Sequence, residues 1–117
     1  MIAAFCFDPL PLFLAVRSDP ALARVPLVSV EEQRVTHANA AARRHGITHG
    51  MRLDGARMRV EGLQVVSYTE PDLQHAWDEL LRELSDRTPW VESLARGRAL
   101  ARLDPAEAEG LAAAYGV

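Results

Sequence analysis

Apolar positions along the chain fall into two kinds of segment, and the two kinds alternate. Short continuous apolar runs are typical of buried strands, whereas apolar residues spaced three and four apart are typical of amphipathic helices. The pattern therefore predicts strands alternating with helices. Strands are expected at residues 2–7, 26–30, 63–68, 89–95 and 100–104, and helices at residues 9–18, 37–46, 52–60, 70–86 and 104–116.

The clearest helix is the fourth, which begins at Thr69 or Glu70 and ends before Pro89. Its apolar residues follow the spacing i, i+3, i+4, i+7, i+8, i+11, which places them on one face of a helix. This face is expected to pack against a sheet. It consists of Leu73, Ala76, Trp77, Leu80, Leu81 and Leu84.

Capping residues support the predicted ends of the other helices. Asp8-Pro9 and Asp104-Pro105 each combine a preferred N-cap residue with a proline that is tolerated at the first helical position. Thr36 is the expected cap of the helix over 37–46, and Gly46 is expected to end it. These signals predict where helices begin and end more firmly than the apolar pattern alone.

The order of elements predicts an α/β (α+β) fold, with a small mixed sheet of about four to five strands packed with helices. The 117 residues are expected to form a single domain, because this length is typical of one domain. The apolar fraction of 49% and charged fraction of 25% are those of an ordinary globular chain and argue against disorder.

Composition excludes several function classes. The formal net charge of −3 gives no overall basic field for nucleic acid. The thirteen basic residues are all arginine, so lysine Schiff-base chemistry and a phosphate-loop lysine are absent. No secretory signal or membrane-spanning run is visible, which predicts a cytoplasmic protein without membrane contact.

The single cysteine, Cys6, excludes an internal disulfide and fits a reducing compartment. Because it lies in an apolar run, it is expected to be buried and inert. His37, His45 and His49 are close in sequence, but Gly46 and Gly50 interrupt any helix that could align them. We therefore expect no zinc site.

Arginines cluster in the middle of the chain, where Asp54 is the only acidic residue among them. Such a cluster could form a positive face for phosphate, or it could be an ordinary solvated helical face. The residue pattern leaves both interpretations open. The cluster consists of Arg43, Arg44, Arg52, Arg57 and Arg59, of which Arg44, Arg52 and Arg57 are candidate phosphate contacts.

The segment over residues 3–15 contains one charged residue, Asp8, among apolar residues and prolines. A buried carboxylate without a partner costs several kcal/mol, so it is normally paired, bound to a metal or used as a helix cap. Three interpretations follow: Asp8 holds a cation, caps a helix, or remains from an earlier function.

Several segments together resemble the N-terminal part of the Y-family (translesion) DNA polymerases. The resemblance covers roughly residues 2–95 and is most specific over 38–51, where an arginine, a glycine and a glycine-methionine pair follow the family's fingers pattern. It implies a palm-like region with a fingers-like segment over about 36–62. The segments that carry the resemblance are DPALARVPLVSV, ANAAARRHGITHGM, LQVV and RTPWVES.

The resemblance implies roles for three residues. Asp8 matches the family's first metal-binding aspartate, and Phe13 matches the aromatic residue that excludes the ribose 2′-hydroxyl. Arg43 matches the fingers arginine that contacts the incoming triphosphate.

The sequence also departs from the family pattern. The family's second aspartate in the opening motif falls on Leu10, and the fingers tyrosine and glutamate fall on Ala40 and Ala41. The Asp-Glu pair that supplies the remaining carboxylates falls on Gly97 and Arg98. A register two residues later places the pair on alanine and leucine and restores no acid.

A single aspartate cannot assemble two-metal chemistry, because Mg²⁺ needs several oxygen ligands. The resemblance therefore implies no enzyme activity, and no cofactor unless a residual Mg²⁺ binds at Asp8. We expect instead that Asp8 caps the first helix, with its charge bonded to backbone N–H groups or offset by Arg96 or Arg98.

The hypothesis that follows is an inactive, ImuB-like accessory domain in DNA damage tolerance, as in the SOS response and bacterial mutasomes. Its implied partners are proteins of that machinery, with weak DNA contact. Two alternatives stay open: a nucleotide- or phosphate-binding module that uses Phe13, Arg43 and Arg44, and a structural homodimer module.

Overall fold

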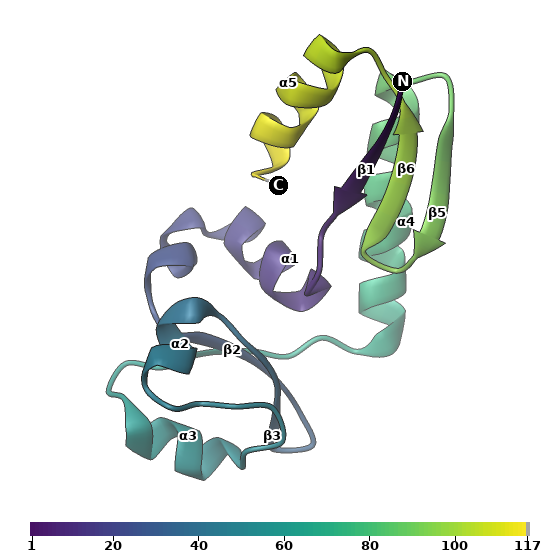
Figure 1. Ribbon diagram of the computed structural model, residues 1–117. Coiled ribbons are helices and arrows are strands. Elements are labelled where there is room, and N and C mark those ends of the chain that lie inside the picture. The colour runs from purple at the N-terminus through teal and green to yellow at the C-terminus, as the bar shows by residue number, and fades with distance from the viewer. Residues whose placement is uncertain (117) are drawn as a thin grey trace. The chain divides into compact units, whose positions relative to one another are not determined.

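A computed structural model describes residues 1–116, which form two compact units (Figure 1). One unit combines Met1–Asp8 with the chain from Pro71 onward, and the other is Pro9–Glu70. The N-terminal strand therefore belongs with the C-terminal part of the chain, and the predicted fingers-like segment lies within the other unit. None of the described helices is long and apolar enough to cross a membrane.

The discontinuous unit is a three-stranded antiparallel sheet with two helices. The sheet order is β1-β6-β5, so the N-terminal strand pairs with the last strand of the chain. The elements are β1 (Ile2–Cys6), α4 (Glu70–Arg87), β5 (Val91–Ala95), β6 (Arg98–Arg102) and α5 (Pro105–Tyr115).

The core of this unit lies between the sheet and α4. Leu73, Trp77, Leu80 and Leu84 of α4 are all buried, which confirms the predicted apolar face. Phe7 follows β1 and is 1% exposed. Its ring meets the rings of Trp77 and Tyr115 edge-on, with centroid distances of 5.9 and 5.4 Å. This geometry is favourable for aromatic pairs and ties β1 to both helices.

The continuous unit contains a second three-stranded sheet, of order β3-β2-β4, in which β2 and β3 are antiparallel and β2 and β4 parallel. Val28, Val35, Ala42, Ile47 and Ala56 form its main buried cluster with Leu63. Its elements are α1 (Leu10–Ser18), the 3₁₀ helix η1 (Pro20–Arg24), β2 (Leu27–Glu31), β3 (Arg34–Ala38), α2 (Ala40–Arg44), α3 (Leu53–Arg59) and β4 (Gln64–Val66).

The α/β class and the order of the predicted elements are confirmed. The strands form two separate three-stranded sheets, where one small sheet of about four to five strands was expected. The predicted helix over 37–46 was too long, because residues 37 and 38 belong to strand β3, which the apolar pattern did not reveal. Helix α2 begins after Asn39, whose side chain accepts the amide of Ala42. Thr36 is therefore not its cap, whereas Gly46 follows its end with φ +79° as predicted.

Two predictions for the N-terminal segment were wrong. Asp8 does not cap α1: the N-cap residue is Pro9, and no side chain bonds the first turn. Cys6 is exposed, because β1 is covered on one face only and its side chains alternate between that face and the open one. An entirely apolar run thus forms a half-exposed strand.

Candidate functional site

Asp8, Gly97 and Arg98 come together at the end of β1. The hairpin between β5 and β6 brings them there, since Cys6 is the ladder partner of Arg98 and Phe7 donates its amide to the carbonyl of Gly97 at 2.6 Å. Residues about ninety positions apart in sequence therefore become neighbours. They are the residues that the resemblance matches to the family's first aspartate and to its Asp-Glu pair.

Arg98 is bound directly to Asp8. Its Nε donates a hydrogen bond to Asp8 Oδ2 at 2.8 Å, which is also an ion pair. This bond and the charge of Asp8 raise the pKa of the Arg98 guanidinium above its ordinary value. Side-chain exposures of 62% for Arg98 and 39% for Asp8 place the pair at the surface, where water weakens its contribution to stability.

Gly97 is tightly constrained beside the same carboxylate. Its φ of +97° lies in the region that favours glycine, and a Cβ on this residue would overlap Asp8 Oδ1 and lie 3.2 Å from Asp8 Cγ. A larger residue, including aspartate, would not fit here with Asp8 in its present position. The turn therefore depends on glycine at this position.

The donor set does not suit a divalent cation. Asp8 is the only carboxylate of this cluster, and its Oδ2 already accepts the bond from Arg98. Over residues 1–116, no three His, Cys, Asp or Glu side chains come close enough together to hold a metal ion. Mg²⁺ prefers six oxygen ligands, usually with more than one carboxylate nearby, and a guanidinium beside Asp8 repels it.

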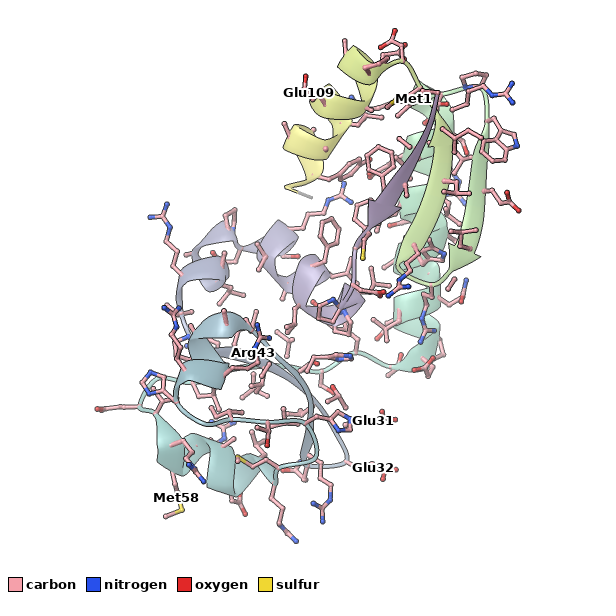
Figure 2. All side chains as sticks on the ribbon, viewed as in Figure 1. Met1, Glu31, Glu32, Arg43, Met58 and Glu109 are labelled. Carbon is pink, nitrogen blue, oxygen red and sulfur yellow. The ribbon has the colours of Figure 1, made fainter. Side chains whose placement is uncertain are left out.

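Arg43 and Phe13, the other residues implied by the resemblance, lie in the continuous unit. The Arg43 guanidinium donates to the carbonyl of Ala38 at 2.6 Å, at the end of the neighbouring strand (Figure 2). Phe13 is half-buried on α1. Both residues are thus at the surface of the continuous unit.

The other candidate phosphate contacts lie on and around α2 and α3. Arg44, Arg52 and Arg57 are all exposed, as is Arg59, whose guanidinium lies against Gly46. His37 belongs to strand β3, where its Nδ1 is 3.2 Å from the hydroxyl of Ser29. His37 thus belongs to a local polar cluster on β2 and β3.

Two features of the continuous unit were missed by sequence reasoning. The turn between β2 and β3 consists of Glu32 and Gln33, both with positive φ, whereas Asn-Gly is the usual signal for such a turn. Asn39 accepts amides from Ala42 and Leu27 and donates to the carbonyl of Val25. Its identity as a preferred N-cap residue was the available signal.

The comparison with known families shows which family the chain belongs to. The model of the impB/mucB/samB family matches residues 11–113. The chain belongs to this family. No curated protein shows a significant match to it.

Solved Y-family polymerases share the fold of this impB/mucB/samB member. DinB from Sulfolobus solfataricus matches with a TM-score of 0.65 at 20% identity, covering 98% of this chain and 37% of that one. A Y-family DNA polymerase chimera of Dbh and Dpo4 gives a TM-score of 0.68 at 19% identity, covering 98% and 38%. A Dbh ternary complex gives 0.69 at 20% identity, covering 98% and 36%. The chain thus spans little more than a third of these structures.

Proposed function

We propose that this chain is a catalytically inactive Y-family polymerase-like domain that acts in DNA damage tolerance as an accessory protein. One observation carries the proposal: the Arg98 guanidinium pairs with Asp8, the residue that the resemblance matches to the family's first metal-binding aspartate. In this family the reaction relies on metal ions that neutralise developing phosphate charge. An arginine paired with the one carboxylate of this cluster cannot coordinate the attacking and leaving oxygens as a metal ion does.

The glycine next to Arg98 supports the same conclusion. Replacing Arg98 alone would free Asp8, but Gly97 would still supply no second carboxylate, and its φ of +97° disfavours any residue other than glycine. In this proposal, the turn conformation and the charge of Arg98 both disfavour metal binding beside Asp8. A domain with this turn retains the family fold, and its remaining use is in contacts with other macromolecules.

A titration with Mn²⁺ tests this proposal. Paramagnetic broadening of the Asp8 amide signal is expected to show no saturable binding at millimolar Mn²⁺ in the wild-type chain. Asp19→Asn serves as a control, since this carboxylate caps η1 far from Arg98 in sequence. Saturable broadening at Asp8 that Asp8→Asn abolishes and Asp19→Asn leaves intact would contradict the proposal.

Phosphate binding by the arginines around α2 and α3 is a second candidate function. The continuous unit has eight arginines and six acidic residues, whereas the other unit has five arginines and ten acidic residues. Charge thus favours the continuous unit as the place for DNA or nucleotide contact. The wild-type chain should bind single-stranded DNA weakly, and the double substitution Arg44→Glu and Arg57→Glu should weaken this binding further. An affinity for DNA that these substitutions leave unchanged would reject this candidate function. Calorimetry that detects no binding of DNA or of nucleotide would reject it as well.

A further inference from the structure

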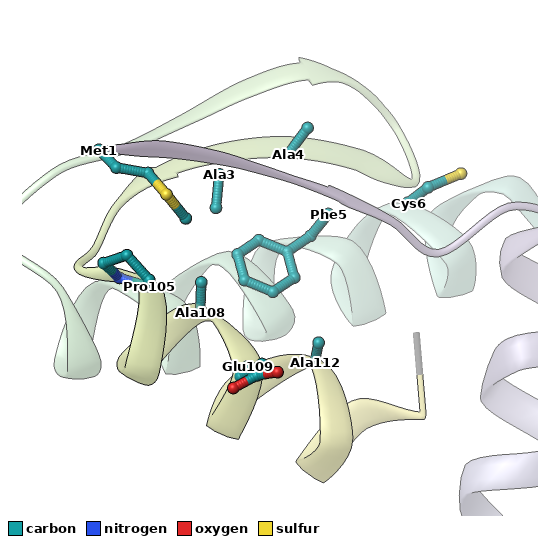
Figure 3. Close-up of a pocket in the computed structure, with 9 residues that line it drawn as sticks. All are labelled: Met1, Ala3, Ala4, Phe5, Cys6, Pro105, Ala108, Glu109 and Ala112. Carbon is teal, nitrogen blue, oxygen red and sulfur yellow. The ribbon is translucent and has the colours of Figure 1, made fainter.

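We draw no further inference here: the strongest candidate, the apolar groove between β1 and α5 (Figure 3), lies at an edge of the sheet where nothing in the part of the chain that the structure describes shows what covers it, since the chain spans only 36–38% of the structures it matches.

Discussion

At the scale of single residues, the contact between Asp8 and Arg98 explains how a lone carboxylate persists in an apolar segment. The side chain turns outward at the end of β1, where a guanidinium meets it at 2.8 Å. The cost of burying an unpaired charge is thereby avoided. Gly97 permits this arrangement, since it provides a positive φ and leaves space for the carboxylate.

We predict that Gly97→Ala destabilises the chain by about 1–3 kcal/mol, because it forces a Cβ into a left-handed position against Asp8. Denaturant unfolding monitored by circular dichroism measures this change. Gly110→Ala is the control: Gly110 lies within helix α5 with nothing near its Cβ position. That substitution should stabilise by roughly 0.5–1 kcal/mol. Equal effects of the two substitutions would contradict the constraint on Gly97.

At the scale of elements, sequence patterns predicted helices better than strands. The spacing of apolar residues gave α4 and its buried face, and Asp104-Pro105 gave the start of α5. Strand β3 was missed because its turn, Glu32-Gln33, adopts positive φ without the residues that favour it. Local residue preference cannot reveal a turn that the pairing of β2 and β3 imposes.

Asn39 connects three segments, and its loss should be costly. Its Oδ1 accepts the amides of Ala42 at 2.9 Å and Leu27 at 3.1 Å, and its Nδ2 donates to the Val25 carbonyl at 2.7 Å. Asn39→Ala should destabilise by about 2–3 kcal/mol in denaturant unfolding, since it removes a helix cap and two further bonds. Asn39→Asp keeps both accepted hydrogen bonds and should therefore lose less stability. Equal losses for the two variants would contradict the cap.

The start of α5 should depend on pH. The backbone N–H of Glu107, and then its side chain, lower the pKa of Asp104 below the ordinary 3.8. A lowered carboxyl pKa stabilises the fold above the unfolded-state pKa, and this contribution disappears as the pH falls through the folded-state value. Acidification below about pH 3.8 should therefore shift the Glu107 amide resonance and fray the first turn. Asp104→Asn should show a much smaller shift, and an identical titration in this variant would contradict the assignment.

At the scale of the whole molecule, the chain keeps the fold of Y-family polymerases over 98% of its own length and 36–38% of theirs. Residue patterns alone predicted the α/β class but could not bring Asp8 beside Gly97 and Arg98, because ninety residues separate Asp8 from Arg98. Only the resemblance to a family indicated that juxtaposition.

Primer extension tests the central claim most directly. The chain is incubated with a primer–template, all four deoxynucleotides, and Mg²⁺ or Mn²⁺, beside an active Y-family polymerase. We predict no templated incorporation with either metal, and none after Arg98→Glu, because Gly97 still lacks a carboxylate. Templated incorporation by the wild-type chain that Asp8→Asn abolishes would contradict the account.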